Sequence, residues 1–300
     1  HESSFTRVTP FCSHYADCGG CTVQDLSYQD QLTVKTEIVK AAFRRKGFAF
    51  RGDAAGEETP DAAGAGIGEA AQDAAAATGQ AAQDAAHEAA HEAAQDAADD
   101  ATGSDGLGPY GYARLLPQPN AILPSPRTEY YRNRLDFTFG AERWLPQDEV
   151  VFGIAVPDRR GLGMHVRNRF DRVLDIDHCH LQPDPSNEIR NRLREFAIRN
   201  DLPFYDAKVH EGFLRLLVIR TSATGNTMVL IVIAREDPDR IMPALTFLRE
   251  RFPNLQSIGF GVNTSKNDTL ADIEFKIVFG QPWLEETCGY FADGLYESLT

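Results

Sequence analysis

The chain of 300 residues has few cysteines, no long apolar run and, over one long stretch, no lysine or arginine. Five cysteines are too few, and odd in number, for the disulfide framework of a small secreted protein. No segment approaches the roughly 20 apolar residues of a membrane-spanning helix, and no basic-then-apolar leader opens the chain. These absences favour a cytoplasmic protein without a membrane partner, in which clustered thiols indicate metal binding or catalysis.

The stretch without lysine or arginine covers positions 54–107, which carry twelve carboxylates. It repeats units such as "AAQDAA" and "AAHEAAHEAA", and Ile67 and Leu107 are almost its only large apolar residues. Such a composition cannot bury enough apolar surface to offset the entropy of folding. We therefore expect residues 51–110 to form a disordered, dispensable acidic insertion. Without its twelve charges the net charge of −14 becomes −2.

Periodic apolar patterns predict ordered structure on both sides of this insertion. Residues 27–46 have helical spacing and end at Gly47, while "YYRNRLDFTFG" alternates as a strand with Leu135, Phe137 and Phe139 on one face. Further strands are expected at 150–156, 172–177, 212–220, 226–234, 254–264 and 270–280, with a turn over 157–170 and helices over 184–200 and 237–252. Strands joined mostly by hairpins, with a few helices, predict an α+β fold in which helices pack on an antiparallel sheet.

The most specific motif is "FCSHYADCGGC", which places Cys12, Cys18 and Cys21 within ten residues. Cys179, after a predicted strand and before a predicted helix, is the natural fourth partner. The spacing alone leaves an iron–sulfur cluster, a zinc site and ordinary thiols open. It favours the cluster, because structural zinc sites usually bring two close cysteine pairs and only one C-x2-C is present. We expect the four sulfurs to lie within a few ångströms of one centre even without a cofactor, and Cys288 to be a free thiol.

These residues resemble the RNA uracil-5-methyltransferases, which make 5-methyluridine in ribosomal and transfer RNA. The resemblance begins with "FCSHYADCGGCTVQDLSYQDQLTVK", continues through "DHCHLQPDPSNEIRNRLREF" and "SIGFGVNT", and covers nearly all of the chain outside the insertion. In the ribosomal RNA members, the positions matching Cys12, Cys18, Cys21 and Cys179 hold a [4Fe–4S] cluster. Members that act on transfer RNA generally lack it. The resemblance therefore implies a [4Fe–4S] cluster and 23S ribosomal RNA as the partner.

The resemblance also implies a division of the chain and a missing part. Residues 1–50 would be the iron–sulfur segment and a helix, 51–110 the insertion, 111–287 a central RNA-binding domain, and 288–300 a truncated tail. The family's catalytic half binds S-adenosylmethionine and supplies a nucleophilic cysteine that adds to uracil. It should follow "WLEET", but "GYFADGLYESLT" matches it poorly. We therefore expect the full-length protein to be a methyltransferase and this chain, a monomer, to be inactive, with no nucleophile role for Cys288.

Arginines and aromatic rings are the residues that suit an RNA contact, because guanidinium groups bind phosphates and rings stack on splayed bases. The candidates lie in "YYRNR" and in the basic stretch 159–172: Tyr131, Arg132, Arg134, Arg159, Arg160, Arg167 and Arg169. The same residues could instead form a solvated sheet face balanced by nearby aspartates. Arg190, Arg192 and Arg194 on the predicted helix are expected at the surface. The alternative function is a stand-alone iron–sulfur or zinc module that binds RNA or senses redox state without catalysis.

Overall fold

The computed structural model describes residues 5–51, 114–153, 156, 158–286, 288–292 and 295–299, and the predictions for 54–107 lie outside them. The chain divides into two units, which are described separately. One unit contains residues 1–11 and 21–128, and the other contains residues 12–20 and 129–300. No helix among the described residues is long and apolar enough to cross a membrane.

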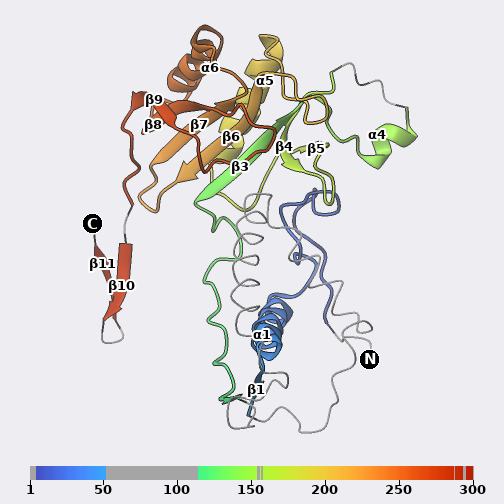
Figure 1. Ribbon diagram of the computed structural model, residues 1–300, viewed down its shortest axis with the longest axis vertical. Helices are drawn as coiled ribbons and strands as arrows, with labels where there is room; N and C mark the ends of the chain where they lie inside the picture. The colour runs from blue at the N-terminus through green and yellow to red at the C-terminus, as the bar shows by residue number, and fades with distance from the viewer. Residues whose placement is uncertain are drawn as a thin grey trace, which may run out of the picture. The chain divides into compact units, whose positions relative to one another are not determined.

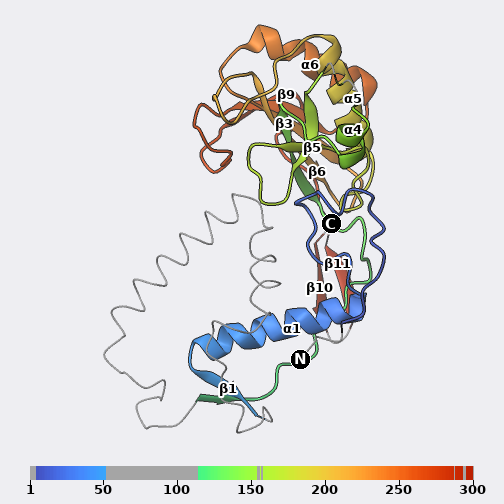
Figure 2. The same cartoon turned by 90° about the vertical axis from the view of Figure 1, so that its right-hand side faces the viewer.

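The first unit is built around helix α1, Tyr28–Arg45, which Figure 2 shows along its length. Ser27 caps it by accepting a hydrogen bond from the Asp30 amide, and Gly47 follows its end with a left-handed φ of 77°. The predicted helix over 27–46 is therefore confirmed. Strand β1, Phe48–Phe50, pairs in parallel with β2, Arg114–Leu116, and the ring of Phe43 meets the rings of Phe48 and Phe50 edge-on.

The second unit contains a seven-stranded sheet in the order β5-β4-β3-β6-β7-β8-β9 (Figure 1). In chain order its strands are β3 Arg134–Gly140, β4 Gly161–His165, β5 Val173–Asp175, β6 Leu214–Thr221, β7 Thr227–Ile233, β8 Ser257–Val262 and β9 Phe275–Gly280. The predicted hairpin of β6 and β7 is confirmed. The prediction that the sheet is antiparallel throughout is wrong, because β7 and β8 pair in parallel. Helix α6, Pro238–Arg251, lies between them in sequence and returns the chain to the same end of the sheet.

Helices α5, Ser186–Arg199, and α6 form the helical layer on one face of the sheet (Figure 1). Leu135 and Phe137 of β3 point to this face and are buried, as are Ile189 and Leu193 of α5. The stacked rings of Phe196 and Phe247, 4.5 Å apart, join the two helices. Alternate residues of β3, beginning with Arg134, point to the opposite side, here called the second face.

Two predictions are wrong here, the strand over 150–156 and the turn over 157–170. Val150 and Val151 end a short helix, α4 Gln147–Val151. Both side chains are exposed, as is that of Phe152, so these apolar residues are not part of a buried strand. Strand β4 instead lies within the predicted turn 157–170. Its alternating glycines hid it, because glycine is depleted in strands. The structure needs them, since a Cβ on Gly163 would lie 2.1 Å from the Leu174 carbonyl oxygen of β5.

The last described residues form a hairpin of two antiparallel strands, β10 Cys288–Ala292 and β11 Leu295–Leu299. The sequence predicts only a tail over 288–300, so this pairing was missed. The side chain of Cys288 lies outside the described part of the chain, and the prediction that it is a free thiol remains a prediction.

Candidate RNA interface and thiol site

Residues 12–20, the thiol segment, fold against the end of β4. Cys18 donates its amide to the His14 carbonyl at 2.8 Å, which closes a turn, and Cys18 then forms an antiparallel bridge with Val166. The Gly19 amide donates to the His165 carbonyl at 3.0 Å, and the Arg167 amide donates to the Asp17 carbonyl at 3.0 Å. These bonds make residues 17–19 a short extension of the sheet, which places Cys18 in a buried position.

Gly19 and Gly20 are each required to be glycine, or favoured as glycine, for a different structural reason. A Cβ on Gly19 would lie 2.9 Å from the His165 carbonyl oxygen, so a side chain there would disturb the bridge to β4. A Cβ on Gly20 would lie 3.4 Å from Cys18 Sγ, and the Gly20 amide donates to the same sulfur at 3.4 Å. The second glycine therefore lets the backbone pass close to a thiol and direct an N–H group at it.

Cys179 lies in the loop between β5 and α5 and is only 9% exposed. Asn187 holds its backbone on both sides: the Asn187 side chain accepts from the Cys179 amide at 2.7 Å and donates to the Cys179 carbonyl at 3.2 Å. Burial raises the pKa of the Cys179 thiol, while the Leu181 amide donates to the sulfur and opposes that rise. This thiol is thus fixed in position and already has one hydrogen-bond donor.

Arg190, expected at the surface, is instead fully buried beneath Cys179, so that prediction is wrong. Its Nε donates to the Ile176 carbonyl at 3.0 Å and its guanidinium lies 4.9 Å from the Phe137 ring centroid. Nη1 is buried without a hydrogen-bond partner among the described residues. Burial lowers the pKa of Arg190 to about 10, and the charge of Cys179 is the largest influence against this shift. A buried cation with an unused donor therefore favours negative charge at Cys179.

Cys12 and Cys18 lie in the same unit as Cys179, and Cys12 influences the pKa of Cys179 electrostatically. Cys21 is the first residue of the segment assigned to the other unit. None of the four forms a disulfide. Within the described ranges, no three or more His, Cys, Asp or Glu side chains are arranged to hold a metal ion. The expected gathering of four sulfurs around one centre is therefore not observed.

The turn that precedes β3, residues 129–133, is fastened to the Cys179 loop. The Tyr130 amide donates to the His180 carbonyl at 2.7 Å, and the Arg132 amide donates to the Leu181 carbonyl at 2.8 Å. The Tyr130 hydroxyl lies 3.1 Å from His178 Nε2 and 3.3 Å from His180 Nδ1. Tyr130 has a left-handed φ of 54°, a conformation that costs about 1–3 kcal/mol in a residue other than glycine and requires such support.

This turn presents two of the predicted RNA contacts to solvent. Tyr131 is 54% exposed, and the exposed Arg132 side chain makes no hydrogen bond or ion pair within the described part of the chain. Arg134, the first residue of β3, points to the second face, and its guanidinium binds both oxygens of Asp136 at 2.9 and 2.7 Å. The charge of Arg132 acts on Cys179, but its guanidinium donors, like the exposed face of the Tyr131 ring, are available to an external ligand.

The other four predicted arginines lie at the two ends of β4. Arg160 binds Asp158 and Asp201 and reaches the carbonyls at the end of α5, so its donors are largely used inside the fold. Arg159 lies beside it and pairs with Glu142 at 3.4 Å. At the opposite end, Arg167 lies over the Tyr15 ring and Arg169 over the Trp144 ring. The antiparallel register places this second end beside the start of β3. The structure therefore does not bring all six arginines to one place.

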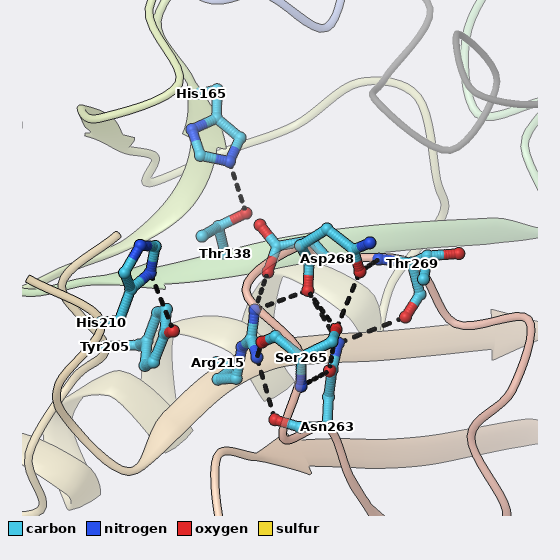
Figure 3. A network of polar contacts seen from close by, with 10 residues as sticks. Thr138, His165, Tyr205, His210, Arg215, Asn263, Ser265, Asp268 and Thr269 are labelled. Carbon is cyan, nitrogen blue, oxygen red and sulfur yellow. Dashed lines mark hydrogen bonds and ion pairs between the residues drawn. The ribbon is translucent and has the colours of Figure 1, made fainter. Parts of the chain in front are cut away.

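Sequence reasoning missed Arg215, which organises the second face next to His165 (Figure 3). Its side chain is 1% exposed and lies 4.2 Å from the Tyr205 ring centroid. It donates to four oxygens of the loop between β8 and β9: Asn263 O at 2.9 Å, Ser265 O at 2.5 Å, Asn267 O at 2.6 Å and Asp268 Oδ1 at 2.8 Å. The available signal was a single charged residue inside the apolar run "FLRLLVI".

A depression beside Arg215 is lined by Thr138, His165, Tyr205 and Asp268 among others. Thr138 and His165 are joined by a contact of 3.3 Å, and burial lowers the pKa of His165. The enclosed space is only of the order of one or two water molecules. It is too small to admit a nucleobase.

No model of a known protein family matches the chain. The chain is 32% identical over 290 residues to an uncharacterized RNA methyltransferase of Bacteroides thetaiotaomicron, covering 95% of this chain and 49% of that protein. It is 33% identical over 285 residues to an uncharacterized RNA methyltransferase of Porphyromonas gingivalis, and this match covers 93% of this chain and 47% of that protein. The chain thus spans about half the length of the curated relatives it matches.

Among solved structures, the chain is similar to the tRNA (uracil-54, C5)-methyltransferase of Pyrococcus abyssi in complex with S-adenosyl-L-homocysteine. The sequence identity is 25% and the TM-score is 0.37. The match covers 59% of this chain and 37% of that one. Over nearly its whole length, then, the chain is similar to proteins named RNA methyltransferases.

Proposed function

We propose that these 300 residues form the RNA-binding portion of an S-adenosylmethionine-dependent methyltransferase that acts on uracil C5 of 23S ribosomal RNA. The observation that supports this most directly is the turn before β3, where Tyr131 and Arg132 are exposed and are tied through the backbone to the Cys179 loop. The relatives named RNA methyltransferases support the reaction class. The proposal places the protein in the cytoplasm as a monomer.

The proposal includes a [4Fe–4S] cluster bound by Cys12, Cys18, Cys21 and Cys179. The donor set suits it, because thiolates bind such clusters and N–H groups directed at the sulfurs stabilise them. Cys18 and Cys179 each accept one backbone N–H bond, and the buried Arg190 beneath Cys179 would offset the negative charge of a thiolate-bound cluster. Cys21 is three residues from Cys18, within about 10–11 Å along the chain. A bound cluster would hold the thiol segment and the Cys179 loop together.

Cluster binding is tested by anaerobic iron–sulfur reconstitution of the wild type and Cys179→Ser. Full iron and sulfide content with a brown colour is expected for the wild type, and loss of the cluster for the variant. The matched control is Cys288→Ser, which removes a thiol outside the proposed ligand set and should keep full iron. Full iron in Cys179→Ser would contradict the assignment. A colourless wild type that retains stoichiometric zinc would favour the zinc-binding module instead.

Methyl transfer is proposed for the whole protein and not for these 300 residues. The chemistry of the family requires a thiolate that adds to uracil C6, a bound sulfonium methyl donor and a base that removes the C5 proton. We assign this work to a part of the protein beyond this chain and expect no methyl transfer from radiolabelled S-adenosylmethionine to ribosomal RNA by the chain alone. Transfer above background would contradict this division of labour.

RNA binding is tested by titrating a labelled RNA hairpin with a uridine loop at several KCl concentrations. We expect weak, salt-dependent binding, because each phosphate contact steepens the dependence of affinity on salt. Arg132→Ala should weaken binding and lower the slope of log Kd against log [KCl] by roughly 0.7–0.9. The control is Arg192→Ala, since Arg192 lies on α5 and pairs with Glu195 on the helix surface. Equal binding by Arg132→Ala and the wild type at every salt concentration would contradict the proposed contact.

A further inference from the structure

The second face of the sheet carries two arginines directly opposite each other, Arg134 on β3 and Arg220 on β6. The neighbouring pair is joined by a hydrogen bond from the Thr221 amide to the Asn133 carbonyl at 2.8 Å. Antiparallel pairs alternate between hydrogen-bonded and non-hydrogen-bonded, so Arg134 and Arg220 form a non-hydrogen-bonded pair, in which side chains are closest. Their Cβ atoms are then about 5 Å apart. Both side chains are exposed.

The charges at this position do not balance. Like charges directly opposite on a sheet destabilise it, and Arg134 is offset by the two-point contact with Asp136. Arg220 has no hydrogen bond or ion pair through its side chain to any residue that the structure describes. Arg134 and Arg220, here called the arginine pair, therefore carry one net positive charge when Asp136 is counted with them. Arg220 keeps a complete set of unused donors.

The surroundings of the arginine pair are rigid. The hairpin after Arg220 is closed by a 2.9 Å bond from the Ser222 amide to the Asn226 carbonyl and by a 2.6 Å contact between the Ser222 and Thr224 hydroxyls. Beneath the pair, Val218, Met228 and Leu230 form a buried apolar cluster on the same face. Rigid support lowers the entropy lost when a guanidinium binds a ligand.

The register places the arginine pair beside the turn of residues 129–133. Arg134 begins β3 directly after that turn, and the Thr221–Asn133 bond joins the end of β6 to it. Arg132, two residues before Arg134, is exposed, and its side chain makes no hydrogen bond or ion pair within the described ranges. The antiparallel partner strand thus continues the basic surface of the turn across to β6.

We propose that Arg220, together with Arg134, binds an RNA backbone phosphate that lies next to the nucleotide contacted by Tyr131 and Arg132. A phosphate accepts forked hydrogen bonds from guanidinium groups and would relieve the repulsion between the two arginines. This inference rests on the proposed RNA-binding function and extends the contact surface from one strand to two. The ligand class is an RNA phosphodiester, since the site offers guanidinium donors, which pair with phosphate oxygens.

The test compares Arg220→Ala, Arg220→Lys and Arg132→Ala with the control Arg192→Ala, using the labelled RNA hairpin over a KCl series. Arg220→Ala should weaken binding about three- to tenfold and lower the salt slope by roughly 0.7–0.9. Arg220→Lys should keep the slope, because the charge remains, but bind more weakly than the wild type because lysine lacks the fork. Without RNA, Arg220→Ala should melt at the wild-type temperature or above it, since the substitution removes a like-charge contact.

The outcomes separate the inference from the function on which it rests. If Arg132→Ala weakens binding and Arg220→Ala does not, the phosphate site is wrong while RNA binding by the turn stands. If Arg220→Ala lowers the melting temperature as well as the affinity, a structural role explains the result and the inference fails. If neither variant changes binding, or if the wild type does not bind the hairpin, both proposals are overturned. An equal loss in Arg192→Ala would show general charge attraction and also overturn the site.

Discussion

Replacing Arg215 with methionine should lower the free energy of unfolding by about 3–4 kcal/mol. Arg215 lies in β6 with 1% of its side chain exposed, and its guanidinium binds three carbonyl oxygens and Asp268 in the loop between β8 and β9 (Figure 3). Methionine approximates the apolar stem of arginine. The substitution therefore removes the charge and the donors while it largely preserves packing.

The size of this loss in unfolding free energy depends on the hydrogen-bond acceptors that lose Arg215. A hydrogen bond to a charged group contributes about 1.5–3 kcal/mol, so three independent bonds to carbonyls would exceed the expected loss. The bonds share one loop and are not additive, and the 34% exposure of Asp268 lets water replace its contact with Arg215. Loss of the guanidinium stacked 4.2 Å from the Tyr205 ring centroid adds to the cost.

Urea unfolding followed by circular dichroism would measure the loss, with an unchanged m-value indicating that the folded state is retained. Arg215→Lys should lose less, because it keeps the charge but not the fork. The control is Arg235→Ala, since Arg235 is exposed, donates one hydrogen bond to the Gly212 carbonyl at 3.1 Å and otherwise lies only loosely over the Phe213 ring, 5.9 Å from its centroid. That change should cost about 0.5 kcal/mol or less. A loss below about 1 kcal/mol in Arg215→Met, or one equal to the control, would refute the assigned role.

Three further predictions concern other parts of the molecule. Gly19→Ala should break the bridge between the thiol segment and β4, because its Cβ would lie 2.9 Å from the His165 carbonyl oxygen; faster hydrogen exchange of the Gly19 and Arg167 amides would report this, and unchanged exchange would count against it. The ion pairs of Asp171 with Lys208 and Arg169 hold the pKa of Asp171 well below its ordinary value of 3.8. The stabilisation is therefore present above that value and is lost as pH falls, so Asp171→Asn should flatten the acid limb of a stability–pH curve, and an unaltered limb would argue otherwise. Deletion of residues 54–107 should leave the melting temperature nearly unchanged, because the Ala/acid repeat has little to bury, whereas a large drop would reveal a docking surface.

Local sequence patterns were sufficient where one element decides its own structure. Helix α1 follows from apolar spacing between a Ser27 cap and Gly47, and the β6–β7 hairpin follows from two apolar runs around a Gly-containing turn. The cysteine spacing likewise identifies the thiol segment as the most specific motif in the chain. These signals are local because capping, turns and periodicity depend on residues close in sequence.

Local patterns failed where packing overrides propensity. Strand β4 was missed because Gly161 and Gly163 lower its strand propensity, yet both glycines are needed where neighbouring chain segments approach closely. Val150 and Val151 suggested a strand, but no neighbouring strand covers them and they end a short helix. The contacts that decide β4, and the lack of cover over the exposed Val150 and Val151, cannot be read from neighbouring residues in the sequence.

The sequence by itself determined helices α1, α5 and α6, the β6–β7 hairpin, the grouping of Cys12, Cys18 and Cys21, and the presence of arginines near Tyr131. Only the tertiary structure decided which arginines are buried, which are ion-paired and which are exposed to an external ligand. It buries Arg190 beneath Cys179, engages Arg160 with Asp158 and Asp201, and places Arg220 opposite Arg134. The physical reason is that burial and strand register depend on chain segments dozens of residues apart. A local pattern can suggest a neighbouring partner such as Asp158, but it cannot show that Arg190 is buried or that Arg220 faces Arg134.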